Sequence, residues 1–185
     1  MSQETAFAGG TPAAVIAALM LCCSISCDLP PQTVDYVDLE RYAGLWYEIA
    51  RYPTPFDEDA VAVTAEYTRN QDGTIGVLNK GRAGTLDGPE TSIQGVARVV
   101  DPATNAKLAV SFDRPELEGI EFPYWIILLD AQYTYAAVSG PTREVLYILS
   151  RSPAMDKTLY IELVDTLVAQ GFERGRIELT PQPAD

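Results

Sequence analysis

The stretch RYAGLWYEIARYP, residues 41–53, places two large aromatic side chains directly after a glycine and continues as an apolar run. Residues 44–52 have the composition of a strand, and the acidic, proline-containing segment YPTPFDEDA that follows is predicted to be a connection. Trp46 therefore stands at the start of the first strand. A large flat side chain at that point can close the end of a sheet that curls into a barrel.

Residues 41–152 alternate short apolar runs with turn-forming segments such as NQDG, DPATN and SGPTRE. Eight strands joined mostly by short turns favour an antiparallel meander, and closure into an up-and-down barrel removes its two open edges. The predicted fold class is therefore all-β, an eight-stranded antiparallel up-and-down barrel. The predicted strands are residues 44–52, 62–69, 74–82, 92–100, 106–113, 122–130, 134–139 and 145–152.

The segment SPAMDKTLYIELVDTLVAQGF, residues 152–172, changes to helical spacing of its apolar residues. Ser152 with Pro153 is expected to start this helix, and Gly171 to end it. Its apolar stripe predicts that the helix packs on the outside of the barrel. RIELTP, which follows, is predicted to be a short final strand.

The composition excludes several classes of function. Acidic residues number 26 against 13 basic ones, and a net charge of −13 opposes attraction to nucleic acid or to anionic lipid. Because the chain has no histidine, Ser–His–Asp and Cys–His mechanisms and His-containing metal sites are excluded. No cofactor is indicated. No metal site is expected either, since the run CCSISC is followed by no second cluster of ligands.

All three cysteines lie near the N-terminus, at Cys22, Cys23 and Cys27. The apolar run at residues 13–25 has the length of a signal-peptide core and is short for a membrane span. With Cys27 after it, the segment resembles a bacterial lipoprotein leader, although its first ten residues lack Lys and Arg and Ser24 stands where such leaders usually have Leu. A non-cleaved anchor and a mis-assigned start codon remain alternatives. The predicted division is a leader at 1–27, a linker and N-terminal turn at 28–40, and the barrel at 41–185.

Three short patterns follow one another along the barrel: Gly44 and Trp46 in the first strand, Asp130 and Tyr133 in LDAQYTYAAVSG, and Arg151 at the end of the eighth strand. These residues resemble the three signatures of the lipocalin family. The flanking segments VLNKG, PYWIILLD and YILSRSP are similar to the group formed by bacterial outer-membrane lipocalins and apolipoprotein D. The resemblance covers about residues 34–180.

A closed eight-stranded barrel brings the start of its first strand next to the end of its last. Arg151 is therefore expected to lie over Trp46, a cation–π contact worth roughly 0.5–2 kcal/mol. Its guanidinium donors can also cap backbone carbonyls of the N-terminal turn. This predicts a structural role for Gly44 and Trp46, without ligand contact.

The lipocalin resemblance implies a ligand cavity lined from five positions of this chain, and strand alternation adds apolar neighbours. Asn79 and the tyrosine hydroxyls would orient a headgroup, and the aliphatic wall would take an acyl chain. The alternative is that the same side chains simply fill the barrel. The five positions are Tyr67, Asn79, Phe112, Tyr124 and Tyr147, and the neighbours are Ala65, Val77, Val110, Ile126, Leu128 and Leu149.

Alternation also makes predictions near the first strand. Trp46, Glu48 and Ala50 are expected to share the inner face, and Trp125 to point outward under the helix. The buried carboxylate of Glu48 would then bond Arg51 or a tyrosine, or lie near water. Two departures from the family concern the cavity: the disulfides of apolipoprotein D are absent, and bacterial relatives often have Trp where Tyr147 stands. The acidic loop tips disfavour an anionic ligand and tolerate a zwitterionic or neutral one.

The resemblance implies a protein, not an enzyme, that binds, stores or transports a lysophospholipid or fatty acid in the bacterial cell envelope. It would be a lipoprotein that carries palmitate as part of the lipid on Cys27, and this lipid would anchor it in the outer membrane. The inner membrane and the periplasm are the alternative locations. Two other functions remain open. An enzyme acting on a lipid would need acids such as Glu48 and Glu66, of which alternation puts Glu66 outside. A filled barrel would bind partners through its rim. Both a monomer and a homodimer are compatible with the sequence.

Overall fold

The computed structural model describes residues 29–55 and 59–183. The predicted leader, with Cys27 as its lipidation site, lies outside the described residues. Residues 56–58 of the first connection lie outside them as well.

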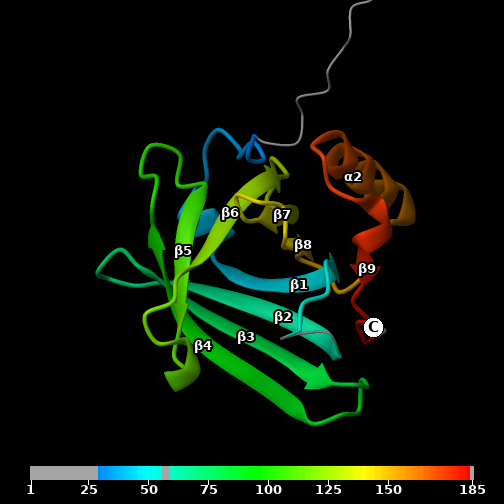
Figure 1. The fold of residues 1–185 in the computed structure, drawn as a ribbon, viewed down its shortest axis with the longest axis horizontal. Helices are drawn as coiled ribbons and strands as arrows, with labels where there is room; N and C mark the ends of the chain where they lie inside the picture. Colours follow the sequence, from blue (N-terminus) through cyan, green and yellow to red (C-terminus); the bar gives the residue numbers. More distant parts are fainter. Residues whose placement is uncertain (1–28, 56–58, 184–185) are drawn as a thin grey trace, which may run out of the picture.

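The described residues form a closed antiparallel barrel (Figure 1), which confirms the predicted fold class. Each strand from β1 to β8 pairs with the next, and the ring closes because β1 pairs with β8 on one side and with β2 on the other. The strands are β1 Gly44–Arg51, β2 Ala60–Arg69, β3 Ile75–Ala83, β4 Glu90–Val99, β5 Lys107–Phe112, β6 Phe122–Leu129, β7 Tyr135–Ser139, β8 Leu146–Ser150 and the short β9 Glu178–Leu179.

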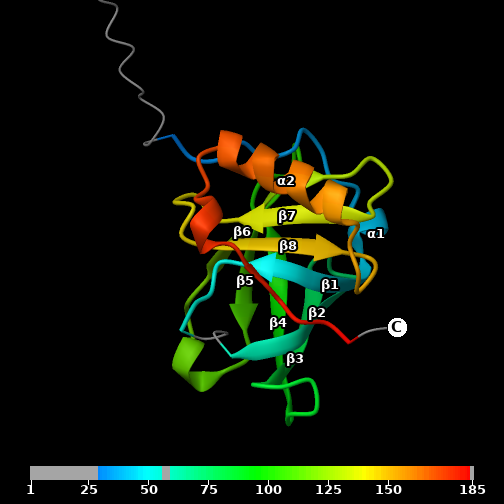
Figure 2. The same ribbon diagram turned by 90° about the vertical axis from the view of Figure 1, so that its right-hand side faces the viewer.

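Two helices and two 3₁₀ turns complete the described part of the chain: α1 Leu39–Tyr42, η1 Pro115–Leu117, α2 Lys157–Ala169 and η2 Arg174–Arg176. We call the end of the barrel at which β1 begins and β8 finishes the closed end, and the other the open end. The connections at residues 84–89, 113–121 and 140–145 belong to the open end, because they follow β3, β5 and β7. Figure 2 shows α1 at the closed end, on the right, and the arrowheads of β1 and β7 at the opposite side.

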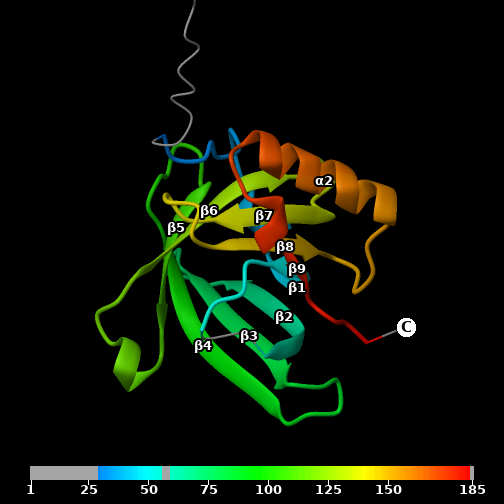
Figure 3. The ribbon, with the colours of Figure 1, turned by 45° about the vertical axis from the view of Figure 1, so that its right-hand side comes forward.

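Helix α2 lies across the outside of β7 and β8 (Figure 3), as its apolar stripe predicts. Leu163, Val164 and Leu167 are buried against Ile49 and Ile148 of the barrel wall. The predicted start of the helix was wrong. Asp156, not Ser152, is the N-cap residue, and its side chain accepts hydrogen bonds from the backbone N–H groups of residues 158 and 159. A carboxylate at this position satisfies two N–H groups that the first turn leaves without partners.

The described strands contain three register shifts, one of them in β2 between Val61 and Thr64, and the other two bear on predicted interior positions. The pairing of β1 with β8 shifts between Glu48 and Ala50, and that of β6 with β7 shifts between Ile126 and Leu128. An extra residue on one strand reverses the alternation beyond it. The predictions that Ala50 and Leu128 face the interior were therefore wrong, because both pack in the outer cluster beneath α2. Trp125 also packs against that cluster, in agreement with its predicted outward direction.

The C-terminal segment lies between β1 and β2 toward the open end. β9 pairs with Ala50 and Arg51 of β1, and the side-chain N–H of Gln182 donates to the carbonyls of Glu48 and Val63, 2.8 and 2.9 Å away. The buried Glu48 carboxylate accepts hydrogen bonds from Arg51 Nη1 at 2.7 Å and from Thr180 Oγ1 at 2.6 Å. Of the two bonding partners predicted for Glu48, arginine is therefore present. Glu66 is exposed on β2.

Candidate functional site

The closed end is sealed by Trp46 and Arg151. The Trp46 side chain is fully buried, and the Arg151 guanidinium lies 3.8 Å from its ring centroid. The same guanidinium donates to the carbonyls of Arg41, Tyr42, Ala43 and Leu45 at 2.7–3.1 Å. One side chain thereby joins the end of the barrel to the turn that precedes its first strand.

Gly44 and the connection between β6 and β7 complete this closure. Gly44 has φ +93°, and a Cβ there would lie 3.4 Å from Arg151 Nη1, so both the backbone conformation and the close approach favour glycine. Tyr133 accepts a hydrogen bond from the backbone N–H of Asp38 at 2.8 Å, and Arg41 stacks on its ring at 4.1 Å. Asp130 accepts from Thr134 Oγ1 at 2.6 Å and so fixes the turn. The signature residues thus surround the N-terminal turn.

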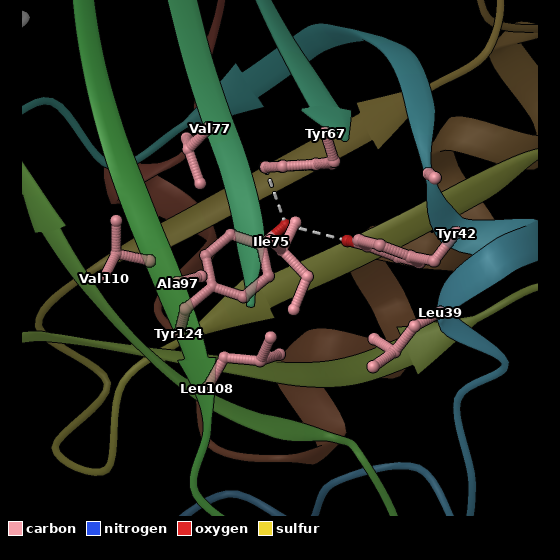
Figure 4. Close-up of a pocket in the computed structure, with 10 residues that line it drawn as sticks. Leu39, Tyr42, Tyr67, Ile75, Val77, Ala97, Leu108, Val110 and Tyr124 are labelled. Carbon is pink, nitrogen blue, oxygen red and sulfur yellow. Dashed lines mark hydrogen bonds between the residues drawn. The ribbon is translucent and has the colours of Figure 1, made fainter. Parts of the chain in front are cut away.

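Above Trp46, three tyrosines form a layer across the barrel (Figure 4). The Tyr124 hydroxyl lies 2.8 Å from that of Tyr42 and 2.9 Å from that of Tyr67, and both pairs are hydrogen-bonded. The Tyr42 ring stacks on Tyr67 at 5.7 Å, while Tyr67 and Tyr124 meet edge to face at 5.8 Å. Because α1, β2 and β6 each supply one ring, the layer ties three separate segments together.

Burial keeps these phenols neutral. Removal from water raises the pKa of Tyr67 to about 12, and it raises the pKa values of Tyr42 and Tyr124 well above the ordinary range. Each hydroxyl therefore keeps its proton at physiological pH and can both donate and accept. The layer is a polar but uncharged surface inside an apolar barrel.

A small cavity of about 20 Å³ lies at this layer, and its walls are almost entirely apolar. A space of this size holds about one water molecule and no acyl chain. Four of the predicted site residues line it: Tyr67, Val77, Val110 and Tyr124. Six others in its wall are not among the predicted residues: Leu39, Tyr42, Ala43, Ile75, Ala97 and Leu108.

Strand alternation could have identified part of this wall. Ile75 and Leu108 stand two residues before Val77 and Val110, so they share the inner face of β3 and β5. Leu39 and Tyr42 belong to α1, where strand alternation does not apply, so this pattern could not have predicted that they face the interior. Of the other predicted residues, Ile126 and Leu149 are buried in the same inner cluster but do not line the cavity.

Toward the open end, the inner wall is only partly buried. Phe112 and Tyr147 pack against the inner cluster yet keep some exposed surface, and the Phe112 ring lies 5.6 Å from that of Phe122. Asn79 stands in the same region of β3, beside Ala65 and Ile93 in the register. Its side-chain Oδ1 is buried and makes no hydrogen bond with any group of the described chain. The upper wall thus combines accessible aromatic rings with one buried acceptor.

Gly95 gives Phe112 its place in this wall. The two residues are cross-strand partners, and a Cβ on Gly95 would lie 2.6 Å from the carbonyl oxygen of Ser111 and 2.9 Å from the Phe112 ring. We expect Gly95→Ala to lower the free energy of unfolding by about 1–3 kcal/mol, because such overlap outweighs the entropic gain of about 0.4–1 kcal/mol that alanine normally brings. Urea denaturation measures the change. Gly175→Ala is the matched control, since a Cβ at that position would have no described atom within 4 Å; equal effects at both sites would contradict the packing role.

The described residues contain no group of three or more Asp, Glu, Cys or His side chains placed to hold a metal ion. Among the same residues, no helix is both long enough and apolar enough to cross a membrane.

Comparison with known proteins agrees with this geometry. The family of the lipocalin-like domain matches residues 37–182, which include α1, the barrel and α2. The chain belongs to the lipocalin family. The match places the closed end and the tyrosine layer inside a lipocalin domain.

Similar lipocalins occur in bacteria, plants and animals. The outer membrane lipoprotein Blc of Escherichia coli is 36% identical over 92% of this chain and 94% of its own length. Temperature-induced lipocalin-1 of Arabidopsis thaliana is 36% identical over 82% of each chain, and mouse apolipoprotein D is 31% identical over 84% of this chain and 82% of its own. Among solved structures, insecticyanin of the tobacco hornworm superposes with a TM-score of 0.65 at 20% identity, covering 84% of this chain and 85% of that one. At that identity, the structural likeness concerns the fold.

Proposed function

We propose that this lipocalin binds a single-chain lipid, preferably a lysophospholipid, in the upper half of its barrel and carries it in the bacterial cell envelope. The lining supports a hydrophobic ligand: Phe112 and Tyr147 offer aromatic surface that solvent reaches, and aliphatic side chains lie below them. Each buried methylene of a ligand contributes about 0.8 kcal/mol, so a chain of about eight buried methylenes contributes about 6 kcal/mol before association costs. Micromolar binding corresponds to about 8 kcal/mol, so it requires the aromatic and polar contacts as well.

The observation that carries the proposal is the buried Oδ1 of Asn79, which has no hydrogen-bond donor among the described groups. An unsatisfied buried acceptor costs about 1–3 kcal/mol, and a ligand that donates a proton there removes this cost. The glycerol hydroxyl or the ammonium group of a lysophospholipid is such a donor. The ionised carboxylate of a fatty acid only accepts, so a fatty acid is the weaker candidate.

The tyrosine layer sets the depth that the lipid reaches. Because the cavity at Tyr42, Tyr67 and Tyr124 holds only about 20 Å³, the bound lipid would end above the three rings. The ligand's length inside the barrel is thus limited to the region between this layer and the open end.

Two features support a place in the cell envelope. The N-terminal sequence resembles a lipoprotein leader that ends at Cys27, and the similar E. coli protein is an outer membrane lipoprotein. We therefore include lipidation of Cys27 and attachment to the outer membrane in the proposal. Mass spectrometry of the protein purified from membranes tests this step, because a lipidated Cys27 adds the mass of its acyl chains.

We expect Tyr147→Ala to weaken lysophosphatidylethanolamine binding about tenfold, which corresponds to about 1.4 kcal/mol of lost ring contact. Displacement of a fluorescent fatty acid measures the affinity. Tyr36→Ala is the matched control, since Tyr36 is exposed and precedes the barrel. Equal affinities for wild type and Tyr147→Ala would count against this site.

The ligand class is tested by the same assay. Lysophosphatidylethanolamine should bind more tightly than palmitate of similar chain length, and Asn79→Leu should reduce this preference because it removes the acceptor. A tighter complex with palmitate would overturn the assignment to lysophospholipid.

The small size of the cavity favours a second candidate, a barrel filled by its own side chains that binds partners through its rim. Native mass spectrometry of the protein as purified separates the two. A lipid bound at about one per protein or per dimer supports the carrier, whereas a protein that is empty and also fails to bind lysophosphatidylethanolamine supports the filled barrel.

A further inference from the structure

The first described residue of the chain is held at the open end of the barrel. Arg143, in the connection between β7 and β8, donates from Nη1 to the backbone carbonyl of Leu29 at 2.7 Å. Its Nε also donates to the Gln170 carbonyl at the end of α2, 2.8 Å away, and its guanidinium lies 5.9 Å from the Phe172 ring. These contacts hold the guanidinium at the end of α2, and its hydrogen bond to Leu29 holds that residue beside the same connection.

From Leu29 the chain runs along the outside of the barrel to the closed end. The backbone N–H of Val34 donates to the Ile126 carbonyl and that of Val37 to the Thr104 carbonyl, before α1 begins at Leu39. Figure 2 shows this path, in blue, starting on the side opposite α1. The chain therefore enters the described structure at the end where the barrel opens.

Cys27 precedes Leu29 by two residues. An extended chain advances at most about 3.6 Å per residue, so a lipid attached at position 27 is joined to the protein within about 7 Å of Leu29. Such a short connection leaves the open end little freedom to turn away from the membrane that holds the lipid.

The open end also exposes aliphatic side chains. Leu29 is 71% exposed, and Ile120, in the connection between β5 and β6, is 46% exposed. Aliphatic side chains at these two places can contact a lipid surface that lies across the open end.

We propose that the open end of the barrel faces the membrane to which the chain is anchored, with Leu29 and Ile120 against the lipid surface. The proposal rests on the proposed lipidation of Cys27. It adds that a single-chain lipid passes between the bilayer and the upper wall at Phe112 and Tyr147 without crossing bulk water.

The negative charge of the open end limits the lipid composition of the membrane surface that this end can contact. Carboxylates crowd the connections of the open end, so repulsion from an anionic surface opposes close approach, and a zwitterionic surface such as phosphatidylethanolamine is favoured. The residues are Asp59, Asp87, Asp113, Glu116, Glu118, Glu121 and Glu144, with Glu90 at the start of β4 beside them; of these, Glu121 is paired with Arg98.

The orientation can be measured with cysteine labels on the full chain, expressed with its own leader and purified from membranes. Glu118→Cys and Thr142→Cys place the label at the open end, and Gln71→Cys and Gln132→Cys place it at the closed end; all four residues are exposed. Each variant carries an environment-sensitive dye and is reconstituted in vesicles of phosphatidylcholine and phosphatidylethanolamine that contain a nitroxide-labelled lipid.

We expect severalfold stronger nitroxide quenching at positions 118 and 142 than at positions 71 and 132. Equal quenching at the two ends, or stronger quenching at the closed end, in a vesicle-bound protein would overturn the orientation alone. A protein that carries no lipid at Cys27 and stays off the vesicles would overturn the anchor and this inference together, while lysophosphatidylethanolamine binding in solution would still test the barrel site. Ile120→Ser should weaken quenching at position 118, and an unchanged signal would remove Ile120 from the membrane contact.

Discussion

Arg151→Ala is expected to lower the free energy of unfolding by about 3 kcal/mol, the largest single loss among the substitutions considered. The guanidinium donates to five backbone carbonyls, the fifth being that of Tyr133 at 3.3 Å from Nε, and it stacks on the buried Trp46 ring. Hydrogen bonds to a charged group contribute about 1.5–3 kcal/mol each, and the cation–π contact about 0.5–2 kcal/mol. The sum is not additive, and the guanidinium is partly exposed, so the expected loss is well below the total.

Urea denaturation of wild type and variant measures this loss. Arg98→Ala is the matched control, because Arg98 also makes a two-pronged pair, with Glu121, but both side chains are about half exposed. Its loss should stay at or below about 1 kcal/mol. Arg151→Lys should recover only part of the stability, since a single ammonium group with three donors cannot reach all five carbonyls. If the unfolding midpoint of Arg151→Ala equals that of wild type, the contacts of Arg151 with Trp46 and the N-terminal turn do not stabilise the barrel.

The second large effect is a loss of stability at high pH. The pKa of Tyr67 is raised from 10.0 to about 12 by burial, and those of Tyr42 and Tyr124 are raised too. In the unfolded chain these phenols release their protons near pH 10, while in the folded chain they keep them. The unfolded state then binds fewer protons, so stability is fully present below pH 10 and falls as the pH rises toward 12. Tyr67 alone accounts for about 3 kcal/mol of this loss.

Urea denaturation at a series of pH values from neutral to alkaline tests this, with phenolate absorbance recorded in parallel. The part of the absorbance that comes from Tyr42, Tyr67 and Tyr124 should rise cooperatively and coincide with unfolding. Tyr67→Phe should make the alkaline loss smaller while lowering stability at neutral pH through the lost hydrogen bond to Tyr124. The chain has ten tyrosines, so the contribution of Tyr67 is taken as the difference between wild type and Tyr67→Phe. A phenolate difference that develops near pH 10 while both proteins stay folded would contradict a buried, neutral layer.

The sequence was informative where a pattern repeats. Eight runs separated by turn formers were enough to predict the barrel, and the order of Trp46, Asp130 and Arg151 was enough to predict its family. The stack of Arg151 on Trp46 could be inferred because a closed ring must bring its first and last strands together. Each of these inferences depends on the spacing of residues within a strand or on the number and order of the strands. Both can be read from the sequence.

Errors arose where a single residue interrupts the alternation. The bulges after Glu48 and after Ile126 turned Ala50 and Leu128 outward, and neither segment contains a glycine or proline that would mark them. Tyr42 was missed for another reason. It enters the barrel from α1, and its bond to Tyr124 joins residues 82 positions apart, which no local pattern encodes. The Asp156 cap was readable in the sequence, but Ser152 before Pro153 offered a competing start.

The C-terminal segment between β1 and β2 bears on how the protein is made. Thr180 bonds a carboxylate 132 positions earlier in the chain, and Gln182 joins two strands that were synthesised long before it. Contacts so distant in sequence form slowly, and these cannot form until nearly all of the chain is available. A growing chain therefore lacks the contacts of the C-terminal segment with β1 and β2 through most of synthesis. Toward the open end, β1 and β2 are joined only after residues 178–182 have been made.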